Sequence, residues 1–335
     1  MTEDREYITR LALGYQISQV LFAALHLRIF TLLEEGAGYP EELAARSGAD
    51  RPAISRLLMV LVDLKLVEEQ GGVYRNTNVA SRCLVEGRKE YWGNTVHHAS
   101  NLWYFWDGLD GQIKSGKAQS PPPAYLEDYP HRLRDYLAAM DESASAKAAA
   151  IAGAIGISKF RRMLDVGCGP GSYGLAFGRF NRDLSVTMID MEPSLDAARA
   201  RVSEGAFQER ITCHTCQVFE DPIPGDGYDL VFLSNLIHIY NEREVELILK
   251  KVWHVLDTPG ELVIHDYLLQ TDGQDQLYAA LFNLSMLVGT PCGKCYSVNE
   301  LKEMLNRLGA AELRVIPIRL GTSLIVARKT KAAAR

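Results

Sequence analysis

The chain has 335 residues, of which 47% are hydrophobic and 23% are charged, and its formal net charge is −6 at pH 7. This is the composition of a globular protein with a sizeable core, and the length suggests two domains. The acidic balance argues against broad nucleic-acid binding, and no stretch approaches eighteen uninterrupted apolar residues, so we expect neither a nucleic-acid partner nor a membrane partner.

The first hundred residues have the pattern of a winged helix-turn-helix. Residues 11–33 are apolar at helical spacing on more than one face. A short helix near 40–46 is followed by a second helix over about 51–64, and then by two short strands with Gly71-Gly72 between them. The acidic N-terminus "MTEDREYITR" lacks the apolar core of a signal peptide, which favours a cytoplasmic location.

A winged helix raises the alternative of a ligand-sensing DNA-binding regulator. Residues 1–90 hold 11 Lys or Arg and 13 Asp or Glu, and the second helix, "RPAISRLLMVLVDL", is apolar almost all round. A helix that reads a DNA groove needs a polar, basic face. We therefore expect this helix to be buried, in a subunit interface, rather than bound to DNA.

An aromatic-rich helical region spans 91–118 and precedes the segment "QSPPPAYLEDYP", whose three consecutive prolines predict a linker. The Ala-rich stretch 131–157 predicts a long helix. The resulting domain prediction is a winged-helix domain over 1–100, a helical connector over 101–157 and a larger α/β domain over 158–330.

From residue 162 onward, strands and helices alternate, which predicts an α/β fold with a doubly wound, mainly parallel sheet. The predicted strands are 162–166, 185–190, 211–216, 229–234 and 261–266, and the predicted helices are 172–180, 194–204 and 241–256. The final β-rich segment, "ELRVIPIRLGTSLIVARK", predicts an antiparallel hairpin that turns at Gly321-Thr322.

The stretch "MLDVGCGPG" over 163–171 places three glycines directly after the first strand of this sheet, where ligands bind in doubly wound folds. Asp190 ends the second strand, 21 residues after Gly169, in a position typical of a carboxylate that accepts ribose hydroxyls. Glycine spacing alone also fits a dinucleotide fingerprint, so an NAD-dependent oxidoreductase is an alternative. Asp165, inside the strand, favours a ligand with an amino-acid ammonium group instead.

Two cysteine pairs, "CHTC" and "CGKC", have the spacing of zinc knuckles. Cys213 and Cys216 lie on a predicted strand, where positions three apart face opposite sides. We therefore expect no metal site.

Together these features resemble the class I S-adenosylmethionine-dependent methyltransferases. The order of segments along the chain is similar to the two-domain small-molecule O-methyltransferases, the family of plant caffeic-acid and bacterial polyketide O-methyltransferases. The segments that carry this resemblance are "LGYQISQVLFAALHLRIFTLL", "EELAARSGADRPAISRLLMVLVDLKLVEE", "LWYFWDGLDGQIKSG" and "YSVNELKEMLNRLGA".

The resemblance implies S-adenosyl-L-methionine as cofactor, S-adenosyl-L-homocysteine as product, and a homodimer formed through the N-terminal domain. It also implies a small aromatic or polyketide-like acceptor that is methylated on a hydroxyl. Methyl transfer to carbon or nitrogen on the same scaffold is an alternative, as is a member that has lost methyl transfer and keeps the cofactor as a structural ligand.

The resemblance places the general base at His238, in "NLIHIYNE". Asp266 ends the fifth strand at the same sheet edge and could hold the other imidazole nitrogen. His265 is an alternative base, but strand alternation points it away from the face of Asp266, which favours a packing role. The implied cofactor contacts are Asp165, Gly167, Gly169, Gly171, Asp190, Met191, Gln217, Val218, Phe219 and Ser234. The candidate acceptor contacts are Met140, Asn283, Met286, Trp103 and Trp106, with Phe105 in the same aromatic cluster.

The sequence departs from the family pattern at three places. Gln217 stands where the family usually has an acid that contacts the adenine amino group. Ile239-Tyr240 follows the histidine in place of the frequent Asp-Trp, and Cys295 stands where many plant members have a second acid near the histidine. His238 is therefore expected to have one carboxylate partner at most.

Overall fold

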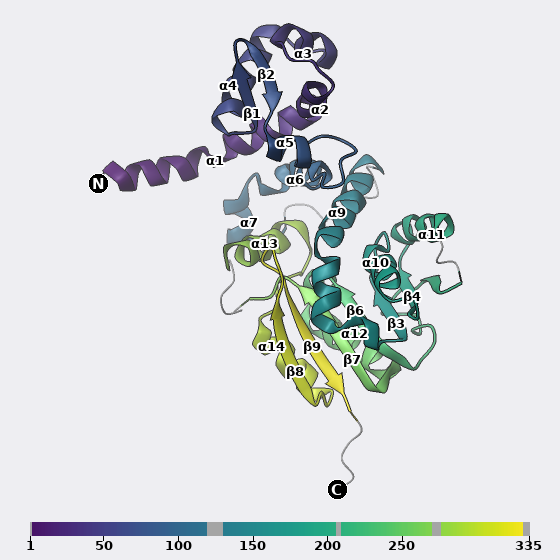
Figure 1. The fold of residues 1–335 in the computed structure, drawn as a ribbon. Helices are drawn as coiled ribbons and strands as arrows, with labels where there is room; N and C mark the ends of the chain where they lie inside the picture. Colours follow the sequence, from purple (N-terminus) through teal and green to yellow (C-terminus); the bar gives the residue numbers. More distant parts are fainter. Residues whose placement is uncertain (1, 119–129, 206–208, 270–275, 331–335) are drawn as a thin grey trace. The chain divides into compact units, whose positions relative to one another are not determined.

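The computed structural model describes residues 2–118, 130–205, 209–269 and 276–330 (Figure 1). The chain divides into two compact units, Met1–Tyr104 with His131–Glu142, and Phe105–Pro130 with Ser143–Arg335. The segment predicted as a Pro-rich linker lies, apart from Pro130, outside the described residues.

The first unit contains the predicted winged helix-turn-helix. Its elements are α1 (Thr2–His26), α2 (Ile29–Glu34), α3 (Pro40–Ser47), α4 (Arg51–Asp63), β1 (Val67–Gln70), β2 (Val73–Asn76), α5 (Asn78–Cys83), most of α6 (Gly93–Trp106) and the first half of α9 (Pro130–Ile155). Strands β1 and β2 pair antiparallel in the register Gln70↔Val73. Gly71 and Gly72 form the turn between them with positive φ, a conformation that glycine adopts without strain.

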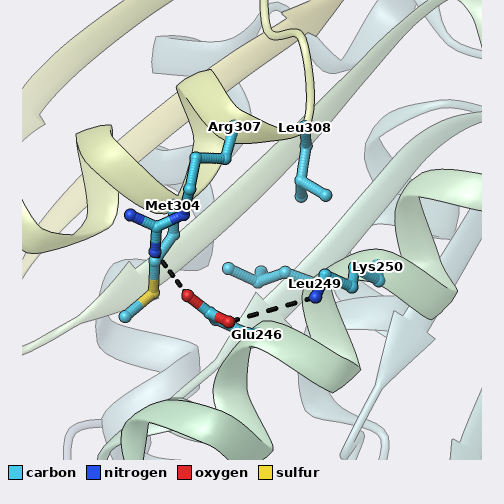
Figure 2. Close-up of a pocket in the computed structure, with 6 residues that line it drawn as sticks. All are labelled: Glu246, Leu249, Lys250, Met304, Arg307 and Leu308. Carbon is cyan, nitrogen blue, oxygen red and sulfur yellow. Dashed lines mark hydrogen bonds and ion pairs between the residues drawn. The ribbon is translucent and has the colours of Figure 1, made fainter.

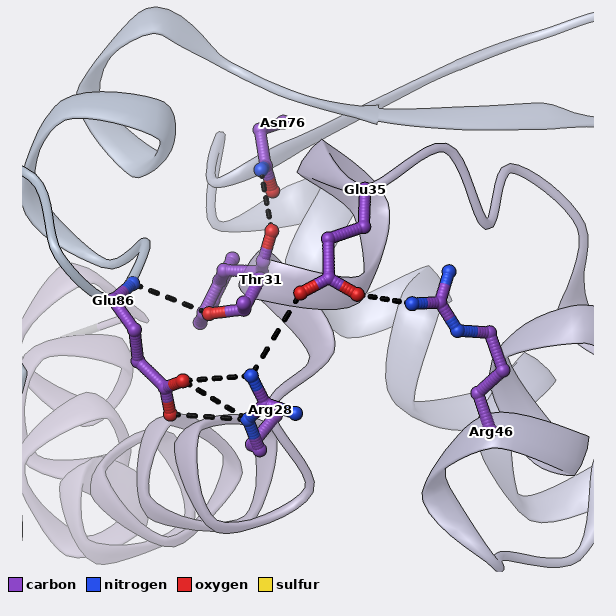
Figure 3. A network of polar contacts seen from close by, with 7 residues as sticks. Arg28, Thr31, Glu35, Arg46, Asn76 and Glu86 are labelled. Atoms are coloured by element: carbon purple, nitrogen blue, oxygen red, sulfur yellow. Dashed lines mark hydrogen bonds and ion pairs between the residues drawn. The ribbon is translucent and has the colours of Figure 1, made fainter.

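Local sequence explains where the helices of this unit begin and end. The Asp50 carboxylate accepts a 2.9 Å hydrogen bond from the Ala53 N–H and caps α4, and Gly48 ends α3 in a left-handed conformation. A polar network then joins distant segments (Figure 3). Arg28 pairs with Glu86 and Glu35, and the Glu86 N–H donates to the Thr31 hydroxyl at 3.2 Å.

Two helices of the first unit expose apolar side chains. Leu11 on α1 is 62% exposed and Met59 on α4 is 65% exposed, while Ile54, Leu58 and Leu61 of α4 are buried. The predicted burial of α4 is therefore only partial within one chain. Residues 3–26 are also long and apolar enough to cross a membrane, a criterion that core helices and signal sequences meet as well.

The second unit is built on a seven-stranded sheet with the order β5-β4-β3-β6-β7-β9-β8. Its strands are β3 (Arg162–Val166), β4 (Ser185–Asp190), β5 (Ile211–Thr215), β6 (Tyr228–Ser234), β7 (Leu256–Asp266), β8 (Glu312–Pro317) and β9 (Ser323–Lys329). Strands β3 to β7 pair parallel, and β9 pairs antiparallel with both β7 and β8. The predicted parallel sheet and C-terminal hairpin are thus confirmed.

Helices cover both faces of this sheet, as strand alternation requires. Leu230 and Phe232 of β6 pack in the core beneath α9, α10 (Ser172–Phe180) and α11 (Ser194–Glu204), whereas Val231 and Leu233 pack beneath α12 (Glu242–Val255) and α14 (Val298–Arg307). The remaining helical elements are α7 (Leu109–Ser115), α13 (Gln276–Gly289) and the short 3₁₀ turns η1 (Ile157–Lys159) and η2 (Ile237–Ile239).

The predicted boundaries are close to the observed ones except in β7. This strand begins at Leu256 rather than at 261, because Leu256 pairs with Tyr228 before the chain passes through Thr258-Pro259 and pairs again from Gly260 onward. A proline and a glycine in sequence indicate a turn, and here they lie inside a strand.

Candidate active site

The glycine loop follows β3 at the carboxyl edge of the sheet. Gly167, Gly169 and Gly171 all have positive φ, between 54° and 74°. The Gly167 and Cys168 N–H groups donate to the Ile189 carbonyl, which holds the loop against β4. A Cβ atom at Gly167 would lie 2.7 Å from Leu236, whereas a Cβ atom at Gly169 would meet no protein atom within 4 Å. Gly169 therefore lies beside open space that a ligand can occupy.

Asp190 ends β4 next to this loop. Its Oδ2 accepts a 2.7 Å hydrogen bond from the Gly169 N–H, and its Oδ1 accepts one of 2.7 Å from the Met191 N–H. Each carboxylate oxygen has a second lone pair, which is available to a ligand hydroxyl. Burial raises the pKa of Asp190, and the two backbone N–H groups partly offset that rise.

Asp165 lies inside β3 and is only 2% exposed. Its Oδ2 accepts a 3.2 Å hydrogen bond from the Gly174 N–H. Burial raises its pKa to about 7, with a small further contribution from Asp190. A buried carboxyl without a cationic partner among the described residues is costly to ionise, and a ligand ammonium group would remove that cost.

Gln217, Val218 and Phe219 lie in the turn after β5. The Gln217 N–H donates to Asp221 Oδ2 at 2.8 Å. The Lys251 ammonium group donates to the carbonyls of Val218, Phe219 and Asp221 at 2.7, 3.1 and 2.8 Å. Sequence reasoning missed Lys251, since a single lysine on a predicted helix gives no signal of such a role.

His238 lies in η2, between β6 and α12, and is buried. Its Nδ1 is 2.7 Å from Asp266 Oδ1, at the end of β7, and the same oxygen accepts a 2.8 Å hydrogen bond from the Tyr267 N–H. The hydrogen bond expected between these two side chains is thus present. With Nδ1 on the carboxylate, Nε2 is the nitrogen free for an acceptor hydroxyl.

Aromatic rings that sequence reasoning missed pack beside His238. Phe282 meets the imidazole edge-on at 4.8 Å, and Tyr267 stacks on Phe282 at 3.9 Å. The Cys295 thiol is buried near Asp266; burial, followed by the charge of Asp266, raises its pKa to about 12. At neutral pH this thiol is therefore uncharged.

His265 is buried in a polar network. Its Nδ1 lies 2.8 Å from Ser234 Oγ and 3.4 Å from the Tyr173 hydroxyl, and its Nε2 lies 3.0 Å from Thr322 Oγ1. Burial, and then the charge of Lys147, lowers its pKa well below 6.5. It is therefore a neutral packing residue. Ser234, a predicted cofactor contact, shares this network.

The predicted acceptor contacts are spread over both units. Met286 is buried on α13, and Asn283 on the same helix accepts the Cys295 N–H at 2.8 Å, so its amide oxygen already has a structural partner. Trp106, with the buried Phe105, belongs to the second unit, whereas Trp103 and Met140 belong to the first. Their role in an acceptor pocket stays a prediction.

A surface groove elsewhere on the second unit contains none of the candidate residues. The groove has a volume of about 260 Å³ and runs between α12 and α14, where Glu246 pairs with Arg307 and Lys250; it is lined by Glu246, Leu249, Lys250, Met304, Arg307 and Leu308 (Figure 2). In the described parts of the chain, no group of three or more His, Cys, Asp or Glu side chains is placed to hold a metal ion, and all six cysteines are free.

Comparison with known proteins identifies the family of the chain. The O-methyltransferase domain model matches residues 122–311, and the O-methyltransferase dimerisation domain model matches residues 9–86. The 3-hydroxy-5-methyl-1-naphthoate 3-O-methyltransferase of Streptomyces sahachiroi is 29% identical over 313 residues, 92% of this chain and 90% of that protein. The N,N-dimethyltransferase OxyT of Streptomyces rimosus is 28% identical, over 79% of this chain and 78% of that protein. The crystal structure of human N-acetylserotonin methyltransferase with S-adenosylmethionine superposes with a TM-score of 0.88 at 25% identity, covering 98% of each chain.

Proposed function

The chain belongs to the S-adenosylmethionine-dependent O-methyltransferase family, and we propose that it methylates a hydroxyl of a small aromatic or polyketide-like acceptor with His238 as general base. The observation that carries the assignment of the base is the 2.7 Å contact between His238 Nδ1 and Asp266 Oδ1 at the sheet edge that bears the glycine loop. The naphthoate 3-O-methyltransferase among the relatives supports the acceptor class.

The residues of the loop and strand ends fit the cofactor. Asp190 would accept hydrogen bonds from the ribose hydroxyls, the open space beside Gly169 would admit the nucleoside, and Asp165 would pair with the amino-acid ammonium group. The side-chain oxygen of Gln217 would accept a hydrogen bond from the adenine amino group. When bound, S-adenosylmethionine supplies the electrophilic methyl carbon that the acceptor oxygen attacks.

His238 makes the acceptor oxygen nucleophilic. A phenolic hydroxyl has a pKa of about 10 and is mostly protonated at neutral pH, so its proton has to leave during attack. His238 Nε2 accepts that proton, and Asp266 stabilises the imidazolium through Nδ1. The half-buried rings of Phe282 and Tyr267 pack beside the imidazole and reduce the access of water to it.

Titration of S-adenosylhomocysteine by calorimetry tests the cofactor assignment. We expect micromolar binding that falls at least tenfold in Asp190→Ala, because the variant loses charge-assisted hydrogen bonds to the ribose. An Asp183→Ala variant is the matched control, since Asp183 lies on the surface before β4. No binding by the wild-type chain would contradict the cofactor assignment.

A His238→Gln variant tests the base. We expect methyl transfer to fall by about 10²–10⁴-fold, while S-adenosylhomocysteine affinity stays within about twofold. His254→Gln, an exposed histidine on α12, is the control. Retained transfer in His238→Gln would remove this residue from the role of base.

Methyl transfer to an amine is the second candidate, supported by the similarity to the N,N-dimethyltransferase OxyT. Amines also lose a proton before or after attack, so the same histidine serves both reactions. Parallel assays with hydroxylated and aminated forms of the same aromatic ring distinguish the two, because the product mass and its acid stability differ.

We propose that two chains associate through the first unit, with α1 and α4 in the interface. The dimerisation domain match covers this region, and its exposed apolar side chains, such as Leu11 and Met59, suit a protein partner better than water. The acidic balance of residues 1–90 supports the absence of a nucleic-acid partner, and an interface role for α1 removes the need for a membrane. Six free cysteines suit a reducing cytoplasm.

A further inference from the structure

Lys147 is a buried charge that the reaction described above does not use. It lies on α9, in the second unit, and is only 2% exposed. Its Nζ donates a 3.0 Å hydrogen bond to Ser143 Oγ, a neutral partner, and lies 5.8 Å from the centre of the Tyr267 ring. It makes no ion pair with another described residue. A buried ammonium group without an anionic partner is costly, so its presence needs a reason.

Asp266 is a buried anion with an oxygen that lacks a hydrogen-bond partner among the described residues. It is 1% exposed. Its Oδ1 contacts His238 Nδ1 and accepts a hydrogen bond from the Tyr267 N–H, whereas its Oδ2 is buried and has no hydrogen-bond partner among the described residues. Burial lowers the pKa of Lys147 to about 8, and the charge of Asp266 opposes that decrease. The amine is therefore still mostly protonated at pH 7, and the two charges act on each other without direct contact.

Four other titratable side chains near Lys147 and Asp266 are neutral at pH 7. Burial raises the pKa of Tyr267 and of Cys295 to about 12 and raises that of Tyr173 further. Burial lowers the pKa of His265 well below 6.5. The ammonium group of Lys147 is thus the buried positive charge that offsets the negative charge of the Asp266 carboxylate.

We propose that Lys147 is a positioning residue of the His238–Asp266 pair: its charge balances the carboxylate and keeps an extra proton off the pair. With a neutral imidazole and an ionised carboxylate, the pair carries one negative charge in a buried place. Without Lys147, the pair would take up a proton on either member, and the base would already be occupied when the acceptor arrives. This inference rests on the proposed role of His238.

The test compares Lys147→Met, which keeps the length and removes the charge, with Lys147→Arg, which keeps the charge. In samples labelled at histidine Cε1, the His238 signal is assigned by its loss in His238→Gln and is titrated from pH 5 to 9. Removing a buried charge that acts on the pair moves the midpoint of the His238 titration by about one pH unit. We expect the midpoint to rise by that amount in Lys147→Met and to stay within about 0.3 units of wild type in Lys147→Arg.

If the proposal holds, the pH dependence of kcat/KM changes together with the midpoint of the His238 titration. In Lys147→Met, we expect kcat/KM to fall about tenfold at pH 6 and to approach the wild-type value at pH 9. An unchanged midpoint, or an equal loss of rate at every pH that Lys147→Arg fails to restore, would overturn the proposal. So would an unchanged midpoint with a tenfold loss of S-adenosylhomocysteine affinity, which would make Lys147 a donor-binding residue.

Failure of the proposed function gives a different result. If the wild-type chain transfers no methyl group, the assignment of the reaction fails, but the His238 titration still reports whether Lys147 controls protonation of the pair. Thermal unfolding of each variant shows that the chain is folded.

Discussion

Replacing Asp165 with asparagine separates the cost of a buried carboxylate from its use in binding. The pKa of this group rises from its ordinary 3.8 to about 7 on folding. At 1.36 kcal/mol per unit, this rise corresponds to about 4 kcal/mol of stability. For an acid with a raised pKa, that contribution is present below pH 4 and is lost as the pH rises through 7. The ligand-free protein therefore loses stability between pH 4 and 7.

Asparagine has nearly the shape of aspartate, and its oxygen still accepts the Gly174 N–H, but it carries no charge. We expect Asp165→Asn to match wild type within about 1 kcal/mol at pH 4 and to be more stable by up to about 4 kcal/mol at pH 8. Urea unfolding of the ligand-free proteins across this pH range measures the difference. Asp190 also has a raised pKa, but it is present in both proteins, so the difference between them isolates Asp165.

Asp165→Asn should gain stability but lose affinity for S-adenosylhomocysteine. If Asp165 faces the ligand ammonium group, the variant loses a charge-assisted hydrogen bond of about 1.5–3 kcal/mol, so S-adenosylhomocysteine affinity falls by about 10–150-fold at pH 8. Wild type should also release part of a proton on binding near pH 7, which calorimetry in buffers of different ionisation enthalpy detects. A variant that binds as tightly as wild type, or whose stability follows the wild-type pH curve, would refute this reasoning.

Three further variants test other parts of the structure. Gly169→Ala should lower the free energy of unfolding by about 1–2 kcal/mol because of its positive φ, and should also weaken S-adenosylhomocysteine binding more than tenfold. Gly309 also has a positive φ and open surroundings, so Gly309→Ala should lower stability alone. Unfolding measures the stability of each variant, and calorimetry measures its binding. Lys251→Met should weaken S-adenosylhomocysteine binding about tenfold because three carbonyls of the turn 218–221 lose their donor, and the exposed neighbour Lys250→Met should leave it unchanged. Leu11→Asp should convert the dimer to a monomer in light scattering at micromolar concentration.

Most of the second unit could be predicted from the sequence because its signals are local. The runs 162–166 and 185–190 match the observed strands because apolar runs end at turn residues on both sides. The start of α12 follows from a capping box, in which Asn241 accepts the Glu244 N–H and Glu244 accepts the Asn241 N–H. The His238–Asp266 contact follows from two parallel strands that end at the same edge.

What the sequence did not predict depends on contacts between segments far apart in the chain. Phe282 beside His238, and Asn283 against the Cys295 N–H, join α13 to elements that no periodicity relates to it. Lys147 lies in an Ala-rich helix, where a lysine is typical of a solvent-facing position. Only the packing of α9 on the core of the second unit makes it a buried charge.

The buried charges distinguish the site from the rest of the core. Four Asp, Glu, Lys or Arg side chains are buried among the described residues: Lys147, Asp165, Glu261 and Asp266. Glu261 has cationic partners in Lys159 and Arg314, as a structural buried charge should. Lys147, Asp165 and Asp266 make no direct ion pair with a Lys, Arg, Asp or Glu side chain in the part of the chain that the structure describes, and Lys147 and Asp266 act on each other only without direct contact. All three belong to the second unit, which carries the glycine loop and His238. A stable core does not need buried charges without a bonded counter-ion, so these three positions are the ones at which we expect ligand binding or proton transfer.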